Sequence, residues 1–192
     1  MDRGAWLFWV LIASLCGASA FFAAGAEGQR RDVRAASVTL ESGAVVSLAE
    51  VVDGDTLLVA TEAGEKVPVR LLGVKAFDTK LEKDVTKTYG QAAVDKLRVE
   101  LEGKPIRVLL HSTPKDKHGR TIATLFVEEH DVGLDLVKSG LALVYTVYPF
   151  PTMQIYLTAQ ELARADRRGL WSNPAAVLRA DALSAEWRRQ AP

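Results

Sequence analysis

Short runs of apolar residues alternate with polar residues in the first half of the chain, a pattern typical of half-buried β-strands. Two β-branched runs, at residues 45–49 and 57–61, flank the tetrapeptide Asp53-Gly54-Asp55-Thr56. Its Asp-Gly pair is a strong signal for a hairpin turn. A further run covers residues 67–74, and a shorter one at residues 38–40 precedes the others. The pattern predicts a set of short antiparallel strands.

The second half of the chain mixes two spacings. Residues 88–102 carry apolar side chains at helical intervals and are followed by Gly103, a common helix stop. Periodicity predicts two more strands, a loop at 111–120, and several later segments. These are strands at 105–110 and 121–127, a short helix at 134–139, an extended stretch at 141–147, a helix at 152–168 and a last helix from Asn173-Pro174.

The helical spacing also predicts which side chains are buried. In the helix at 152–168 we expect Ile155, Leu162 and the neighbouring alanines to form the apolar side. In the last helix we expect Leu178, Leu183 and Trp187 to pack against the domain.

Five short strands, with a helix between the third and fourth, predict an α+β fold: a five-stranded OB-type β-barrel with appended helices. We place this domain at residues 38–174 and a C-terminal helix at 175–192. Residues 77–87 interrupt the periodicity with alternating acids and lysines, which predicts a charged loop.

An N-terminal hydrophobic segment precedes the domain, because residues 5–26 contain no charged side chain. Arg3 ahead of the segment and small residues near its end are typical of a signal peptide. About 20 apolar residues also suffice to cross a bilayer as a membrane anchor. We therefore expect residues 1–26 to be a signal peptide or membrane anchor and residues 27–37 a linker. The protein would then be secreted, periplasmic or anchored to a membrane.

Charge and composition limit the function classes. Apolar content of 48% and charged content of 25% are those of a globular protein that can bury a core. The charges of the 24 basic and 24 acidic residues cancel. Binding to a polyanion would therefore have to come from a local cluster of basic side chains. The single cysteine, Cys16, lies in the hydrophobic segment, and the three histidines lack paired spacing. A disulfide or a thiolate metal site in the folded part is therefore excluded, and the histidine spacing does not indicate zinc.

Candidate chemistry centres on the hairpin turn. Asp53 and Asp55 leave the turn, and Arg70 enters a following apolar run. Two carboxylates and a guanidinium at one end of a small sheet could hold a hard cation and a phosphate. An ordinary turn and a solvent-exposed arginine would show the same residues. This pattern alone therefore does not distinguish a binding site from a simple turn.

Six motifs, which follow one another in a fixed order along the chain, resemble those of a known family. Together, over about residues 44–172, they resemble the staphylococcal nuclease (thermonuclease) family. The motifs are Asp53-Gly54-Asp55-Thr56, Arg70-Leu71-Leu72-Gly73-Val74, Tyr89-Gly90-Gln91-Ala92-Ala93, Asp116-Lys117-His118-Gly119-Arg120, Gly140-Leu141-Ala142 and Gly169-Leu170-Trp171.

The resemblance implies an OB-type fold and calcium-dependent hydrolysis of DNA or RNA, single-stranded or denatured, by a monomer. It places Asp55, with Asp53 nearby, at the metal. It places Arg70 and Arg120 on the phosphate, where guanidinium groups stabilise the charge of the transition state. The position of the acid near the attacking water falls on Asp78.

The loop and the aromatic segment supply the remaining candidates for substrate contact. Lys117 and His118 stand in the loop before Arg120, and His118 occupies a position where the family usually has tyrosine. Tyr145 and Tyr148 flank Thr146, which lies near another family tyrosine. We expect these four side chains, Lys117, His118, Tyr145 and Tyr148, to bind substrate.

Residues 75–78, which follow Arg70, differ from the family pattern. Lys75 stands where the family has an acidic metal ligand, and Asp78 is one methylene shorter than the family's glutamate. Each unit of charge at a few ångströms amounts to roughly 4 kcal/mol at an effective dielectric of about 20. We therefore expect a loss of calcium affinity on the order of a thousandfold. Lys75 could itself occupy the cation position and pair with Asp55.

Three functions stay open at this point. The protein could be a nuclease with weak or altered activity, carried by Arg70, Arg120 and Asp78. It could be a catalytically inactive module that binds nucleic acid or another anion. It could also be an interaction or envelope-anchored domain in which these residues form internal ion pairs.

Overall fold

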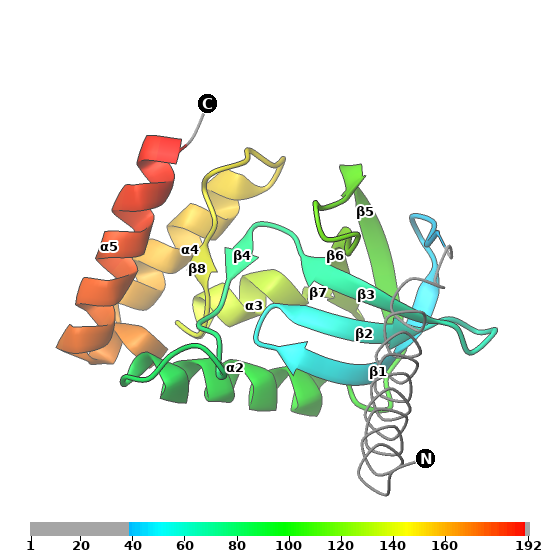
Figure 1. Ribbon diagram of the computed structural model, residues 1–192, viewed down its shortest axis with the longest axis horizontal. Helices are drawn as coiled ribbons and strands as arrows, with labels where there is room; N and C mark the ends of the chain where they lie inside the picture. The colour runs from blue at the N-terminus through cyan, green and yellow to red at the C-terminus, as the bar shows by residue number, and fades with distance from the viewer. Residues whose placement is uncertain (1–38, 191–192) are drawn as a thin grey trace, which may run out of the picture. The chain divides into compact units, whose positions relative to one another are not determined.

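Five strands close into a barrel in the computed structural model, which describes residues 39–190 (Figure 1). Strand β1 pairs antiparallel with β2 and β5, β2 with β3, and β5 with β6. A parallel pairing of β3 with β6 closes the ring. The strands are β1 (Val45–Asp53), β2 (Thr56–Ala60), β3 (Lys66–Leu71), β5 (Ile106–Lys115) and β6 (Thr121–Val127).

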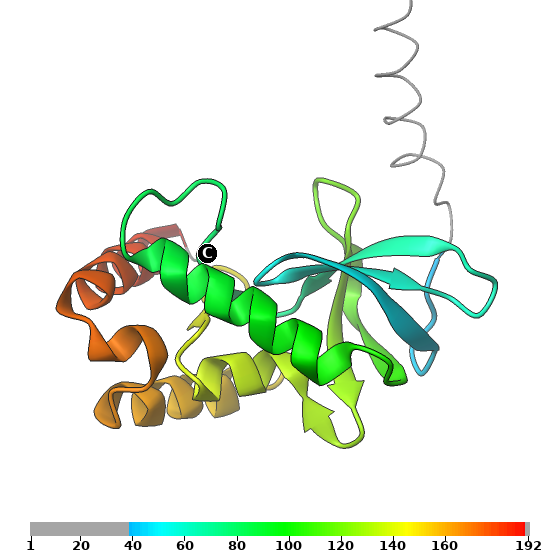
Figure 2. The ribbon, with the colours of Figure 1, turned by 90° about the horizontal axis from the view of Figure 1, so that it is seen from below.

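Four helices and several short elements surround the barrel. Helix α2 runs along one side of it, and α3, α4 and α5 lie beyond its end (Figure 1, Figure 2). Their bounds are α2 (Thr86–Leu101), α3 (Val132–Lys138), α4 (Met153–Ala165) and α5 (Pro174–Gln190), with a 3-10 turn η1 (Gly169–Ser172) and the short strands β4 (Val74–Lys75), β7 (His130–Asp131) and β8 (Leu143–Val144).

The predicted OB-type α+β fold is confirmed, and three element predictions need correction. Thr39 and Leu40 are not in a strand, because no neighbouring strand pairs with them. The predicted strand at 67–74 divides into β3 and β4 at Gly73, whose φ of +72° turns the chain. Strand β5 runs on to Lys115, which pairs with Thr121, so the loop predicted at 111–120 is a shorter turn.

The buried face of α4 also differs from the prediction. Ile155 and Leu162 are 58% and 59% exposed, whereas Tyr156 and Gln160 are buried. The Tyr156 hydroxyl donates to Asp131, and Gln160 Oε1 accepts from a backbone amide of β8. The alanines Ala159 and Ala163 are buried, as predicted. Hydrogen bonds satisfy the polar groups on this face, so hydrophobicity alone misplaces Ile155 and Leu162.

Helix α5 packs into the same core as the elements before it. Asn173 accepts hydrogen bonds from the amides of Ala175 and Ala176, which caps the helix start that the Asn-Pro pair predicts. Trp187 is buried and Leu183 is partly buried, as predicted, but Leu178 is 72% exposed because it points away from the core cluster. The core cluster joins Phe77, Leu143, Val147, Ala163, Leu170, Trp171, Ala176, Ala180 and Trp187.

The predictions for residues 1–26 and 27–37 lie outside the described residues. Among residues 39–190, no helix has both the length and the apolar character needed to span a membrane.

Gly90 sets the distance between α2 and the segment after β4. A Cβ at this position would lie 2.2 Å from the carbonyl oxygen of Phe77. We expect Gly90→Ala to lower the free energy of unfolding by about 2 kcal/mol, because crowding outweighs the higher helix propensity of alanine. Denaturant unfolding checks this, with exposed Gln91→Ala on the same helix as a control expected to stay within about 0.5 kcal/mol. Equal stability of the two variants would contradict the close approach.

Candidate functional site

The turn between β1 and β2 buries one carboxylate. Asp53 Oδ1 accepts a hydrogen bond of 2.9 Å from the amide of Asp55, which fixes the turn. Gly54 lets this turn approach α2 and the residue after β4, because a Cβ there would lie 2.9 Å from Cβ of Ala93 and 2.6 Å from Cβ of Ala76. Asp55 is only 1% exposed. The turn therefore carries its second carboxylate into the protein.

Two cations and two hydrogen-bond donors surround the Asp55 carboxylate. Arg70 Nη1 lies 2.6 Å from Oδ1, and Lys75 Nζ lies 3.3 Å from Oδ2. The amide of Ala76 donates to Oδ2 at 2.9 Å, and the Thr56 hydroxyl donates to Oδ1 at 3.2 Å. Burial alone would raise the pKa of Asp55, but Arg70 and Lys75 hold that pKa below its ordinary value. The carboxylate is ionised, and its charge is already neutralised by side chains.

Asp53 has the opposite environment. Burial and the negative charge of Asp55 raise the pKa of Asp53 above its ordinary value. It is therefore a poorer anionic ligand than an exposed aspartate would be.

The donor set around Asp55 does not fit calcium. Calcium takes six to eight oxygen ligands with several carboxylates among them. In residues 39–190, no group of three or more acidic, histidine or cysteine side chains gathers at a common point. Lys75, on β4, places an ammonium beside the buried Asp55 carboxylate. The cation is thus supplied by the chain itself.

Arg120 reaches the same turn from the opposite hairpin. The turn that joins β5 to β6 holds Asp116, whose carboxylate accepts from Arg120 Nε at 2.8 Å and from the amides of His118 and Arg120. Arg120 Nη1 donates to the Thr56 hydroxyl at 3.0 Å. Arg70 pairs with Thr56 across the β2–β3 ladder. The two guanidinium groups therefore converge on the start of β2.

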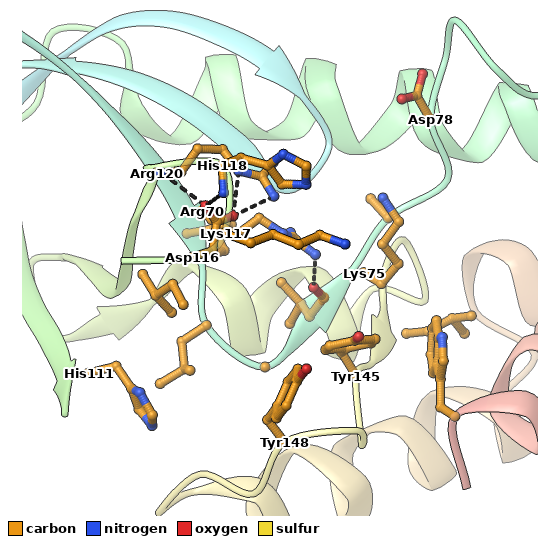
Figure 3. A pocket seen from close by; sticks show the side chains of 18 of the residues that line it. Arg70, Lys75, Asp78, His111, Asp116, Lys117, His118, Arg120, Tyr145 and Tyr148 are labelled. Carbon is orange, nitrogen blue, oxygen red and sulfur yellow. Dashed lines mark hydrogen bonds and ion pairs between the residues drawn. The ribbon is translucent and has the colours of Figure 1, made fainter. Parts of the chain in front are cut away.

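A cleft of about 750 Å³ lies in front of these groups (Figure 3). Its cationic side contains Arg70, Lys75, Lys117 and Arg120. Its aromatic side contains Tyr145 and Tyr148, whose ring centroids are 6.2 Å apart, together with Leu183 and Trp187 of α5. The cleft is suited to a ligand that has both an anionic and an aromatic part.

Most of the predicted site residues meet at this cleft. Arg70, Arg120, Lys117, His118, Tyr145 and Tyr148 line it, and Asp55 and Asp53 lie behind it in the β1–β2 turn.

Asp78 lies apart from the two arginines, on the far side of Lys75 (Figure 3). Its Oδ1 accepts from the amides of Lys80 and Leu81 at 2.7 and 3.1 Å. The carboxylate lines the cleft but also closes its own turn. Asp78 is one methylene shorter than the glutamate of the family and therefore reaches less far. Its position does not compensate for this, because it lies away from the arginines.

The sequence reasoning did not assign Leu183 and Trp187 to the site. Trp187 contacts Tyr145 edge to face, with centroids 5.1 Å apart. The helical spacing predicted that Trp187 packs against the domain. Nothing in that spacing indicated that the buried face of the helix borders the cleft.

The depressed pKa of Asp55 predicts a loss of stability in acid. Its folded-state pKa lies below the unfolded value of about 3.9, so the ion pairs stabilise the protein above that pH and are lost as the pH falls through the folded-state pKa. In urea unfolding, Asp55→Asn should be less stable than the unmodified protein at about pH 7, by several kcal/mol. The difference should shrink below about pH 4. A difference that stays constant with pH would contradict an ionised Asp55.

Comparisons with known proteins agree with one another. Residues 68–173 match the family described as staphylococcal nuclease homologue. An uncharacterized endonuclease of Haemophilus influenzae is 31% identical over 138 residues, 72% of this chain and 69% of that protein. A thermonuclease of Staphylococcus intermedius is 30% identical over 122 residues, 63% of this chain and 72% of that protein. Endonuclease YncB of Bacillus subtilis is 36% identical over 132 residues, 66% of this chain and 61% of that protein.

Proposed function

Because the chain belongs to the staphylococcal nuclease family, we propose that its cleft binds the backbone of DNA or RNA and hydrolyses phosphodiester bonds slowly and without calcium. The observation that carries the proposal is the ion pair of Lys75 with Asp55, at 3.3 Å, beside two convergent arginines. The Lys75 ammonium supplies positive charge near the phosphate. It also pairs with the carboxylate that a divalent ion would otherwise need as a ligand.

Arg70 and Arg120 bind the phosphate in this proposal. Each guanidinium is held by carboxylate and oxygen partners on the protein and can still direct N–H groups into the cleft. During hydrolysis, water loses a proton and adds to phosphorus, the ester bond breaks, and the leaving oxygen takes up a proton from solvent. Negative charge grows on the phosphate oxygens in the transition state. Fixed guanidinium groups stabilise that charge without reorganising.

Asp78 accepts the proton of the attacking water in this proposal. Of the carboxylates that line the cleft in the described part of the chain, Asp116 and Glu82 are paired with arginines, whereas Asp78 has no cation partner. To reach the phosphate, Asp78 must give up its turn hydrogen bonds. This requirement, together with the Lys75 ammonium that pairs with Asp55, makes slow turnover the expected result.

Binding without cleavage is the second candidate function. It is favoured by the same turn, which holds the Asp78 carboxylate with two backbone amides, away from the arginines. Arg70, Arg120, Lys117 and the two tyrosines would then form a site for a nucleic-acid strand, with phosphates on the cationic side and bases on the aromatic side.

One assay separates the two candidates. Residues 27–192 are incubated with end-labelled single-stranded DNA and RNA, in calcium, in other divalent ions and in chelator, and binding is measured in parallel. Cleavage that persists in chelator and disappears in Arg120→Ala supports the proposed hydrolysis. Binding without cleavage at high protein concentration supports the second candidate. Cleavage only with calcium contradicts the role given to Lys75.

For location, we propose that the domain is exported or held at a membrane by residues 5–26, which lie outside the described structure. The proposal rests on the uncharged apolar run and the small residues that follow it. The N-terminal sequence of the mature protein tests it. A new N-terminus near residue 26 supports export, an intact one in the membrane fraction supports anchoring, and an intact one in the soluble cytoplasmic fraction contradicts both.

A further inference from the structure

The segment between β4 and α2, residues 76–85, forms one side of the cleft. Asp78, Leu81 and Glu82 of this segment line it. The segment arches beside α5 at the start of α2 (Figure 2). Amides within it have defined partners, since Lys80 and Leu81 donate to the Asp78 carboxylate and Glu82 donates to the Asp78 carbonyl.

Both ends of the segment pack into the core cluster to which α5 also contributes. Phe77 is 4% exposed and belongs to the core cluster that includes Ala176, Ala180 and Trp187 of α5. Val85 packs against the same cluster at the other end. The family match ends at residue 173, so the helix that supports the segment lies outside the matched region.

The middle of the segment is held by one side chain of α5. Arg179 Nη2 lies 3.2 Å from Glu82 Oε2, and Arg179 Nε lies 3.7 Å from Asp84 Oδ2. Asp84 also accepts from the amide of Thr86 at 2.8 Å, at the start of α2. Hydrogen bonds from Thr86, together with the Arg179 charge, hold the pKa of Asp84 below its ordinary value. A single guanidinium thus bridges the segment to α5.

We propose that Arg179 is a positioning residue, which holds the 76–85 segment against α5 and so sets the mouth of the cleft for a nucleic-acid strand. This role rests on the proposed function. Arg179 acts in two ways: it restrains the turn that carries Asp78, and it neutralises Glu82, a carboxylate that would otherwise repel phosphate at the cleft.

The chain offers a matched control for Arg179. Arg164 of α4 makes a bidentate pair with Asp181 of α5, at 2.6 and 3.0 Å, and neither residue lines the cleft. Arg179→Met and Arg164→Met each remove one positive charge; the first removes the ion pairs of Arg179 with Glu82 and Asp84, and the second removes the pair of Arg164 with Asp181. Only the first removes the contact with the segment.

Hydrogen exchange tests the restraint without any ligand. In the full domain, residues 27–192, we expect the amides of Lys80, Leu81 and Glu82 to exchange about threefold to fivefold faster in Arg179→Met, as the loss of an exposed ion pair predicts. They should be unchanged in Arg164→Met. Equal exchange in all three proteins, or equal acceleration in both variants, overturns the restraint.

Strand binding and cleavage test the consequence. For labelled oligothymidylate, we expect Arg179→Met to raise KM, or Kd if no cleavage occurs, about threefold to fivefold, up to about 1 kcal/mol. Turnover, where present, should rise rather than fall, because Asp78 must leave its turn hydrogen bonds to reach the phosphate. The charge-reversed pair Arg179→Glu with Glu82→Arg should slow the exchange of the same three amides relative to Arg179→Glu alone, because it restores an ion pair between the segment and α5.

The failures of the two proposals are distinguishable. Absence of both cleavage and binding in the unmodified protein refutes the proposed function and the strand-positioning role with it, whereas the exchange result alone decides whether Arg179 restrains the segment. Binding that is equal in Arg179→Met and the unmodified protein overturns the positioning role even if the segment loosens.

Discussion

Replacing Lys75 with aspartate is expected to raise the calcium affinity of the protein about a thousandfold. The change removes an ammonium 3.3 Å from Asp55 Oδ2 and adds a carboxylate, a difference of two charge units. Each unit is worth roughly 4 kcal/mol at short range in an effective dielectric of about 20 before screening. A thousandfold change needs about 4 kcal/mol, well within that sum.

Titration calorimetry with calcium measures this gain. Lys117→Asp is the matched control, since it makes the same charge change at an exposed position of the same cleft, whereas the ion pairs of Asp55 are with Arg70 and Lys75. We expect the control to gain at most about tenfold, because exposed charges are screened. Equal gains in the two variants would show that Lys75 has no special relation to the Asp55 carboxylate.

Adding Asp78→Glu to Lys75→Asp extends the same test to catalysis. The longer side chain recovers about 1 Å of reach, and a general base must come within about 3 Å of its proton. Calcium-dependent cleavage by the double variant, where the unmodified protein shows none, would mean that the scaffold is intact and that these two positions limit it. Calcium binding without cleavage would place the remaining defect in the turn that holds residue 78.

Replacing Arg120 with alanine is expected to lower turnover by a hundredfold to a thousandfold, if the protein cleaves nucleic acid. The guanidinium is oriented by Asp116 and by the Thr56 hydroxyl, so it meets the phosphate already in place. The loss of one preorganised donor at a charged transition state has an effect of about this size. Arg120→Lys should restore little, because an ammonium cannot reproduce the planar fork of donors.

Turnover under saturating single-stranded DNA measures the effect, and Lys117→Ala serves as the control. Lys117 is exposed on the same turn, and we expect its loss to change mainly the affinity, by severalfold. Thermal unfolding should show Arg120→Ala folded. Unchanged turnover in a folded Arg120→Ala protein would remove Arg120 from the reaction, and a trace contaminant would then have to be sought as the source of cleavage.

The barrel was predictable because its signals are local. The Asp-Gly turn between β1 and β2, the alternation along β3 and β6 and the Asn-Pro start of α5 each depend on residues adjacent in sequence. The buried face of α4 was not predictable in this way. Tyr156 and Gln160 lie inward because Asp131 and a β8 amide, both distant in sequence, satisfy them.

The sequence by itself determined the family and the five-stranded barrel, and it predicted that Arg70, Arg120 and Lys75 belong to the site. These follow from residue identity and short-range order. Only the tertiary structure decided that Lys75 turns toward Asp55, that Asp78 is held in its own turn and that α5 borders the cleft. The reason is that side-chain direction and the approach of distant segments depend on packing and on charge partners, which no local pattern records.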